Sequence, residues 1–260
     1  MQIRSLGYRT DLMIRALEGS QLEDRGDYLV VRSPHNPTYW WGNFLLAAPK
    51  PGQAGRWVAT FTAEFPDARH IAIGVDVTEI SAVDIGEYIA RDLRLERSSV
   101  LTAQELADPP RPNRRASYRE LSGDKDWRQS ADLRAMVNAG EPGSDPDFLE
   151  ARVAAERALT EAGHGSWFGA FVDGVLVAQL GLITDGSGVA RYQNVETHPD
   201  WRRRGLAGSL VWEAGRHGLD ALGAGTLVIV ADPLADAIRV YRTLGFADAE
   251  TQVGFERQPD

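Results

Sequence analysis

The sequence contains no cysteine, which excludes disulfide bonds, thiolate metal ligands and a cysteine nucleophile. The five histidines show no pair at the spacing of metal ligands, so we expect no metal site. A Gly-x-Ser-x-Gly sequence, the nucleophile turn of many serine hydrolases, is also absent. The chemistry of this chain is therefore expected to use neither metals nor these nucleophiles.

Long hydrophobic runs and an excess of basic residues are missing as well. No stretch approaches the roughly 20 apolar residues of a membrane-spanning helix, and residues 1–6 lack the apolar region of a signal peptide. The formal net charge of −9 argues against a general nucleic-acid binder and suits an amine substrate. We therefore expect a cytoplasmic protein that binds neither membranes nor nucleic acid, and whose 260 residues hold one large domain or two small ones.

The most informative segment is a run of three arginines, Arg202 to Arg204, directly before the sequence Gly-Leu-Ala-Gly at residues 205–208. The hydrophobic spacing of residues 206–222 predicts a helix that begins there. The first turn of a helix carries unpaired N–H groups and a partial positive charge, so stability alone would favour carboxylates at this place. Arginines fit if an anion such as a phosphate is held by the amides and guanidinium groups together.

The flanking elements limit which phosphate-binding loop this is. Residues 189–197 and 226–231 are expected to be strands, and a second helix is expected at 233–243, capped by Asp232. A nucleotide-triphosphate loop would need lysine where Leu206 follows Gly205, and a dinucleotide loop would need a third glycine. Both alternatives fail.

The remaining pattern, Arg202-x-x-Gly205-x-Ala207, resembles the pyrophosphate loop of the GNAT superfamily, the acyl-CoA-dependent N-acyltransferases. Residues 195–207 resemble the complete strand-and-loop motif, and residues 241–246 resemble a second signature, a helix with a tyrosine four residues before Gly-Phe. The resemblance implies acetyl-CoA as cosubstrate, without a metal. It also implies these contacts to it: Val195, Thr197, Arg202, Arg203, Arg204, Gly205, Leu206, Ala207, Gly208 and Asp232. Many members carry asparagine at the position of Asp232.

The resemblance implies direct attack of an amine on a thioester, which needs a base for the amine and an acid for the leaving thiolate. Tyr241 is the candidate acid, because a phenol with a pKa near about 10 is protonated at neutral pH; simple packing at a helix end is the alternative. Glu196 is the candidate base, although a pair with a nearby arginine is equally compatible with its position. Gln193 could position a substrate, and His198 is expected to lie outside the reaction centre.

Strict alternation along the strand at 189–197 would place two sets of side chains on opposite faces. The first set is Arg191, Gln193, Val195 and Thr197. The second set is Tyr192, Asn194 and Glu196.

The fold class is expected to be α/β with a mixed sheet of the α+β kind. We expect an N-terminal α/β domain at residues 1–106, a proline-rich linker at 107–115 and a GNAT-like domain at 116–260. In the last, strands are expected at 117–121, 167–172 and 175–182, and helices at 127–137 and 148–159, with Asp173-Gly174 as a tight hairpin turn.

The N-terminal half shows strand patterns at 28–32, 38–46, 70–77 and 95–101 and helix patterns at 55–65 and 82–94. This order repeats that of the C-terminal half, so a degenerate second copy of the fold is one interpretation. The loop at residues 49–55 does not keep the arginine and glycine spacing, and this half is not expected to bind the cofactor. The aromatic residues between 36 and 44 favour packing over a ligand pocket.

Together these patterns predict an N-acyltransferase that moves an acetyl group from acetyl-CoA to a primary amine of a small molecule or peptide. The alternative from a different class is a non-catalytic acyl-CoA-binding or regulatory module. The sequence leaves the identity of the acceptor and a homodimer open.

Overall fold

A computed structural model describes residues 1–50, 52–140 and 145–258 of the chain. It divides into two compact units. Unit 1 contains Met1–Val100, Val230–Pro233 and Ala249–Asp260, and unit 2 contains Leu101–Ile229 and Leu234–Asp248. Three strands contain residues of both units: β5 (Arg94–Ala103), β10 (Thr226–Ala231), whose last two residues belong to unit 1, and β11 (Ala247–Arg257). The predicted linker at residues 107–115 lies within unit 2.

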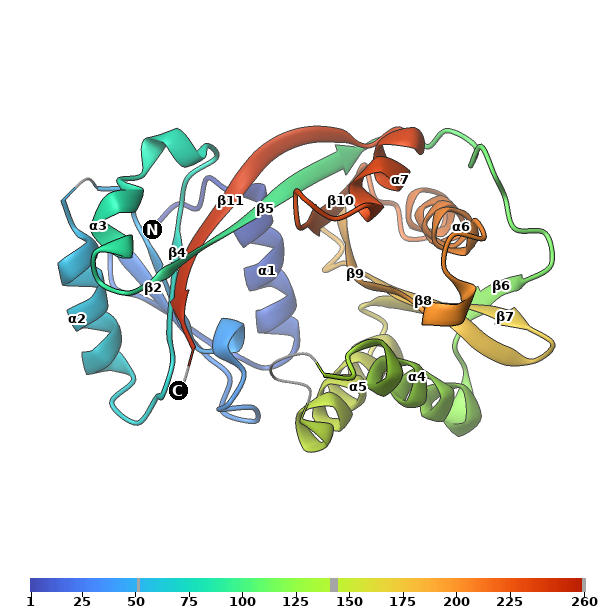
Figure 1. Cartoon of the computed structure of the whole chain (residues 1–260), viewed down its shortest axis with the longest axis horizontal. Helices are drawn as coiled ribbons and strands as arrows, with labels where there is room; N and C mark the ends of the chain where they lie inside the picture. The colour runs from blue at the N-terminus through green and yellow to red at the C-terminus, as the bar shows by residue number, and fades with distance from the viewer. Residues whose placement is uncertain (51, 141–144, 259–260) are drawn as a thin grey trace. The chain divides into compact units, whose positions relative to one another are not determined.

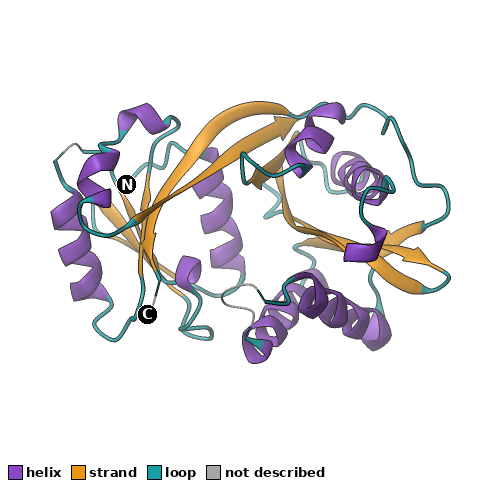
Figure 2. Ribbon diagram, viewed as in Figure 1, coloured by secondary structure: helices purple, strands orange, loops and turns teal. Residues whose placement is uncertain are grey.

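Unit 2 is built on a mixed sheet with the strand order β10-β9-β8-β7-β6 (Figures 1 and 2). Its strands are β6 (Ser117–Glu120), β7 (Gly165–Val172), β8 (Val175–Ile183), β9 (Val189–Thr197) and β10 (Thr226–Ala231). Its helices are α4 (Gly123–Val137), α5 (Pro146–Glu161), α6 (Leu206–Asp220) and α7 (Ala237–Thr243). Helices α4 and α5 cover one face of the sheet and α6 covers the other (Figure 1).

Most of these elements match the sequence patterns. The hairpin between β7 and β8 turns at Asp173 and Gly174, whose φ angles of 52° and 81° are those of the tight turn that the pair predicts. Helix α5 begins as expected, with Pro146 in the first turn and the Asp145 carboxylate accepting from the Phe148 N–H at 3.1 Å.

The second helix after the arginines begins later than predicted. We expected it from residue 233 with Asp232 as its cap, but α7 begins at Ala237 with Asp236 at the cap position. Residues 233–236 form turns instead. Asp232 therefore does not cap this helix.

A bulge in β9 overturns the predicted alternation. Glu196 pairs with Gln179 and Gln193 pairs with Gly181, so two residues of β9 lie opposite the single Leu180. Asn194 makes this possible with a φ of 46°, a conformation that asparagine tolerates better than most residues. The side-chain order shifts by one, and Glu196 shares its face with Gln193 rather than with Tyr192.

Unit 1 contains the strands β1-β2-β3-β4-β11, in this order, of the chain's 11-stranded sheet. Its strands other than β11 are β1 (Gln21–Asp24), β2 (Tyr28–Arg32), β3 (Phe44–Ala47) and β4 (Ile71–Val75). Its helices are α1 (Leu6–Leu17), α2 (Ala54–Glu64), the short α3 (Ile85–Ile89) and the 3-10 turns Trp40–Gly42 and Ile80–Ala82. The strand predicted at 38–46 is shorter, because a 3-10 turn occupies its first half, and the helix predicted at 82–94 is reduced to α3.

The aromatic residues between positions 36 and 44 pack within unit 1. Phe44 is fully buried, the Trp41 indole N–H donates to Glu256 at 2.8 Å, and Trp40 stacks on His70 at 6.3 Å between ring centroids. These contacts favour the packing role predicted for the run.

The two halves of the chain repeat one arrangement. In each, a strand and the strand after the following helix pair in parallel: β3 with β4 around α2, and β9 with β10 around α6. The turns that follow α3 and α7 also correspond. After α3 the Leu93 N–H donates to the Tyr88 carbonyl at 3.2 Å, and after α7 the Phe246 N–H donates to the Tyr241 carbonyl at the same distance. Asp92 and Gly245 hold the matching positive φ angles, 60° and 99°. This geometry supports the interpretation of the N-terminal half as a second copy.

Candidate active site

The N-terminus of α6 is open to an anion. Its cap residue is Gly205, with a φ of 77° and no side chain to bond the first turn, and that turn contains no acidic residue. The first backbone bond of the helix runs from Ser209 N–H to the Gly205 carbonyl, so the N–H groups of Leu206, Ala207 and Gly208 precede the helical ladder. These amides and the helix dipole favour an anion at this position.

The arginines before the helix surround the same place. Arg202 donates from Nε to the Thr197 carbonyl at 3.3 Å, which leaves the rest of its guanidinium group for a ligand. Arg203 is 88% exposed and lies 3.8 Å from Asp236, a separation that water screens strongly. Arg204 instead packs its guanidinium group 4.8 Å from the centre of the Trp201 ring.

A cavity of about 1020 Å³ joins the helix terminus to β9 and α7. Ten of the residues predicted from the sequence line it: Val195, Glu196, Thr197, Arg202, Arg203, Gly205, Leu206, Ala207, Gly208 and Tyr241. Arg204 and Asp232 are not among its lining residues. His198, whose Nδ1 accepts from the Asp200 N–H at 3.1 Å, does not line it either.

Strand β9 presents backbone groups to this cavity. Its parallel ladder with β10 pairs only Val189–Arg191 with Thr226–Val228, and β9 continues to Thr197. Beyond Arg191 the backbone groups on this side have no ladder partner on β10 in the described part of the chain. Such groups can pair with an extended polar ligand.

Tyr241 meets the cavity as a buried phenol. Its side chain is 4% exposed, and burial raises its pKa to about 12. Within the described residues its hydroxyl makes no hydrogen bond, in contrast to that of Tyr192, which donates to the Val211 carbonyl at 2.7 Å. A hydroxyl that is protonated at neutral pH and lacks a protein partner is suited to donate a proton to a ligand.

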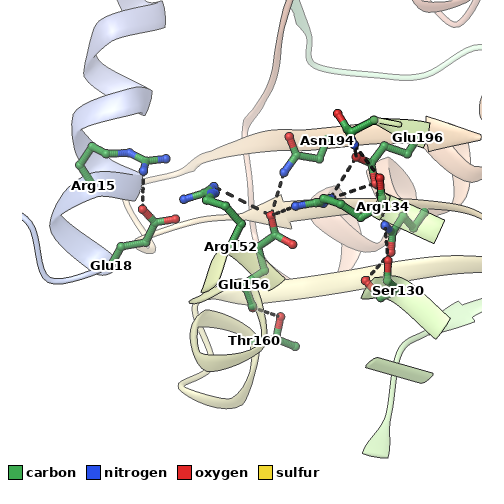
Figure 3. Close-up of polar contacts among 11 residues, drawn as sticks. Arg15, Glu18, Ser130, Arg134, Arg152, Glu156, Thr160, Asn194 and Glu196 are labelled. Carbon is green, nitrogen blue, oxygen red and sulfur yellow. Dashed lines mark hydrogen bonds and ion pairs between the residues drawn. The ribbon is translucent and has the colours of Figure 1, made fainter. Parts of the chain in front are cut away.

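Glu196 is held by several donors (Figure 3). Its carboxylate lies 3.0 Å from Arg134 Nε, accepts from Gln179 Nε2 at 2.6 Å and accepts more weakly from Asn138 Nδ2 at 3.4 Å. The pair with an arginine, left open by the sequence, is therefore present. These donors fix the direction of the carboxylate.

Arg134 belongs to a larger buried network, shown in Figure 3. Its Nη1 donates to Glu156 at 2.6 Å, and Asn194 at the bulge donates to the same oxygen at 2.8 Å. Arg134 and Glu156 are 4% and 2% exposed. Burial opposes the charge of Arg134, but Glu156 and Glu196 outweigh it and raise the pKa of the guanidinium group. The bulge and Glu196 are thus tied to one charged cluster, of which the sequence revealed only Glu196.

Part of the chain matches a known protein family. The model of the acetyltransferase (GNAT) family matches residues 130–246, a range that includes the loop, the bulged strand and Tyr241. Residues 130–246 are a GNAT-family domain. No match to a curated protein was found.

Solved structures resemble the chain over nearly its whole length. A GCN5-related N-acetyltransferase from Kribbella flavida has a TM-score of 0.68 and 18% identity, with 98% of this chain and 97% of that chain covered. One from Sphaerobacter thermophilus has a TM-score of 0.64 and 19% identity, with 95% and 84% covered. A tandem GNAT protein from the clavulanic acid biosynthesis pathway has a TM-score of 0.57 and 14% identity, with 95% and 88% covered. At these identities the similarity shows the fold, and it covers both halves of the chain.

The N-terminal copy has closed the place that corresponds to the cavity of the GNAT domain. At the start of α2 the Glu87 carboxylate accepts from the Ala54 N–H at 3.3 Å, where α6 would receive an anion. The hollow there measures only about 10 Å³. That this half does not bind the cofactor stays a prediction, and residue 51 of its loop at 49–55 lies outside the described residues.

Several cavity residues were not predicted from the sequence. The proline-rich segment contributes Pro109, Pro110 and Arg111 to the GNAT domain's cavity. The remainder are Val137, Trp201, Ala235, Asp236, Ala237, Arg239, Val240, Thr243 and Leu244. The α7 residues follow from the periodicity around Tyr241, whereas no sequence signal connects residues 109–111 to this site.

Among the described residues, no group of three or more histidine, cysteine, aspartate or glutamate side chains could hold a metal ion. In the same residues, no helix combines the length and apolarity that a bilayer crossing needs.

Proposed function

We propose that this protein transfers an acetyl group from acetyl-CoA to a primary amine. One observation carries the proposal: the uncapped N-terminus of α6 and Tyr241, whose hydroxyl has no hydrogen-bond partner among the described residues, line the same cavity. A volume of about 1020 Å³ is ample for the acyl-pantetheine arm and an acceptor together.

The backbone and the arginines would bind the cosubstrate. The N–H groups of residues 206–208 and the side chains of Arg202 and Arg203 are suited to the pyrophosphate. The free edge of β9 beside Val195 and Thr197 is suited to the amides of the pantetheine arm. Such contacts would place the thioester between β9 and Tyr241.

The reaction then needs one bond to form and one to break. The amine nitrogen attacks the thioester carbonyl, the C–S bond breaks, and the sulfur leaves as a thiolate that receives the proton of Tyr241. Glu196 is the proposed acceptor of the amine proton, directly or through a water molecule. Arg134 and Gln179 hold its carboxylate in a fixed direction, and its negative charge also attracts a cationic amine.

Calorimetric titration of the full chain with acetyl-CoA and with free CoA tests the binding part. We expect both to bind with a stoichiometry of one, because the hollow at the start of α2 measures only about 10 Å³ where the cavity in unit 2 measures about 1020 Å³. Failure of both to bind would overturn the proposal.

Thiol release from acetyl-CoA in the presence of a panel of small amines and peptides tests the transfer. Release that depends on an amine supports the enzyme. Binding without release with any amine would favour the alternative, an acyl-CoA-binding or regulatory module.

A further inference from the structure

The segment from Glu105 to Asn113, called the strap here, contributes Pro109, Pro110 and Arg111 to the cavity of unit 2. At one end the Ala107 N–H donates to the Leu244 carbonyl at 3.0 Å, beside Tyr241. At the other end Asn113 donates from Nδ2 to the Arg204 carbonyl at 2.8 Å and from its backbone N–H to Ser209 Oγ at 3.0 Å. The strap is therefore fastened to both segments that carry the sequence signatures.

Glycines of these segments make room for the strap. A Cβ atom on Gly205 would lie 2.2 Å from the Arg111 carbonyl oxygen, and one on Gly245 would lie 3.4 Å from the Glu105 carbonyl oxygen. On α6, a Cβ atom on Gly215 would lie 2.4 Å from the Leu106 side chain. At Gly205 the loop therefore lies directly against the backbone of the strap.

The far end of the strap has a fixed conformation. Asn113 Oδ1 accepts from the N–H groups of Arg115 and Ala116 at 3.0 and 3.1 Å, and the Tyr118 hydroxyl donates to the Asn113 carbonyl at 2.8 Å. The prolines at 109, 110 and 112 restrict the backbone just before it. A segment held in this way can deliver a side chain to a defined place.

Arg111 is the side chain that the strap delivers. It lines the same cavity as Arg202, Arg203 and the first turn of α6. Among the described residues its guanidinium group has no hydrogen-bond or ion-pair partner. Arg115, by comparison, pairs with Asp173 at 2.8 Å, and Arg114 does not line the cavity.

We propose that Arg111 is a ligand of the phosphate groups of the cosubstrate, contributed by the strap. The proposal rests on the proposed function and extends the set of binding residues beyond the GNAT loop. A guanidinium group without a protein partner beside uncapped amides gains a charge-assisted contact when a phosphate binds. It also makes the strap a part of the binding site rather than a mere connection.

Calorimetric titration of full-length variants with CoA tests this proposal. Arg111→Ala should weaken CoA binding about tenfold, the scale of one lost charge-assisted contact. Arg114→Ala, an exposed arginine of the same segment, should change it less than about twofold. Arg111→Lys should lie between, because it keeps the charge and loses the planar fork.

The outcomes separate this proposal from the proposed function. If the parent binds CoA and Arg111→Ala binds it as Arg114→Ala does, Arg111 is not a ligand, and the proposed function stands. If the parent binds no CoA, both proposals fail. Since all three substitutions are on exposed side chains, equal melting temperatures should show that each variant is folded.

A second titration, with dephospho-CoA, shows which phosphate group Arg111 binds, because this ligand lacks the ribose phosphate and keeps the pyrophosphate. A loss with Arg111→Ala that persists for this ligand assigns Arg111 to the pyrophosphate, and a loss that disappears assigns it to the ribose phosphate. Asn113→Ala should also weaken CoA binding. In the Arg111→Ala background it should weaken CoA binding little further, because both substitutions remove the same contact between Arg111 and the phosphate. Full additivity of the two losses would overturn delivery of Arg111 by the strap.

Discussion

At the scale of single residues, Tyr241 and Tyr192 form an informative pair. Both phenols are buried, but the Tyr192 hydroxyl donates to a backbone carbonyl, whereas the Tyr241 hydroxyl lines the cavity without a partner among the described residues. Two tyrosines of similar burial thus have different capacities to interact with a ligand. Their phenylalanine variants can separate catalysis from packing.

We predict that Tyr241→Phe lowers turnover by about 100-fold or more, because the leaving thiolate loses its acid. Affinity for acetyl-CoA should change by less than about twofold, since the hydroxyl acts only in the transition state. Steady-state thiol release and calorimetry measure the two quantities. Tyr192→Phe is the control: it removes a buried hydrogen bond and should cost about 1 kcal/mol of stability with turnover retained. Equal turnover in the Tyr241 variant and the parent would remove the acid role.

The pKa of Tyr241 also predicts a pH profile. The acid form is required, and burial raises the pKa to about 12, so ionisation of this tyrosine should not reduce the rate below about pH 10. The rate should instead rise with pH as the acceptor amine loses its proton. Thiol release between about pH 6 and 10 measures this profile. A fall between about pH 8 and 10 in the parent that is lost in Tyr241→Phe would keep the acid role and contradict the raised pKa of Tyr241.

Two features of Gly205 disfavour a side chain, namely its positive φ and its contact with the strap, and their effects can be measured separately. Its φ is positive, which costs a residue with a Cβ about 1–2 kcal/mol, and the added Cβ would meet the Arg111 carbonyl at 2.2 Å. Gly186 shares the positive φ but has nothing within 4 Å of the added Cβ. We predict that Gly186→Ala loses stability alone, whereas Gly205→Ala loses more stability and also CoA affinity. Equal effects in urea unfolding and calorimetry would mean that the strap accommodates the methyl group.

At the scale of secondary-structure elements, the bulge in β9 connects the sheet to the charged cluster. Asn194 at the bulge and Arg134 on α4 both donate to Glu156 on α5, and Arg134 continues to Glu196 on β9. One guanidinium group therefore joins three elements. Removal of one member leaves the other charges buried without compensation.

We predict that Arg134→Met lowers the free energy of unfolding by about 3–5 kcal/mol. Adding Glu156→Gln should restore part of the loss, because one uncompensated buried charge is then removed. Arg157→Met is the matched control on α5, where a half-buried arginine pairs with the exposed carboxylates of Asp124 and Glu161, and little change is expected. Urea unfolding measures all of these variants. A double variant less stable than Arg134→Met would show that the cluster is not governed by charge compensation.

The elements also show what the sequence could predict. Strand β9, helix α6 and strand β10 were readable because their periodicity and turn residues agree with their surroundings. The predicted start of α7 was wrong, because Asp232 and Pro233, which resemble a helix cap and first turn, precede the helix by several residues. The first helix, α1, was not predicted, although Ser5 caps it by accepting from the Tyr8 N–H.

For the candidate site the limit was distance along the chain. The loop and Tyr241 carry signatures, and ten of the predicted residues line one cavity. The strap carries none, because its role depends on Asn113 meeting Ser209, 96 residues away in sequence. Prolines in such a segment indicate an extended backbone but not the surface on which it lies.

At the scale of the whole molecule, the two units are interlaced along the chain. The C-terminal strand β11 leaves unit 2 at Asp248, and its residues Val253–Arg257 pair with β4 of unit 1. Unit 2 in turn begins at Leu101, before the segment expected to be a linker. Neither unit is therefore a continuous stretch of sequence that could be excised at the proline-rich segment.

Two fragments test this interlacing. Residues 116–260, the predicted GNAT-like domain, lack the strap and retain the half of β11 whose partner strand is β4. We expect this fragment to aggregate and to unfold without a cooperative transition, because an unpaired strand edge is exposed and the contacts to Leu244, Arg204 and Ser209 are lost. Residues 101–248 keep the strap and omit that half strand, so this fragment should be more soluble and should retain CoA binding. Thermal unfolding by circular dichroism and CoA titration, with the full chain as control, measure the difference. If residues 116–260 fold cooperatively and bind CoA with full affinity, neither the strap nor the pairing of β11 with β4 is needed for the site.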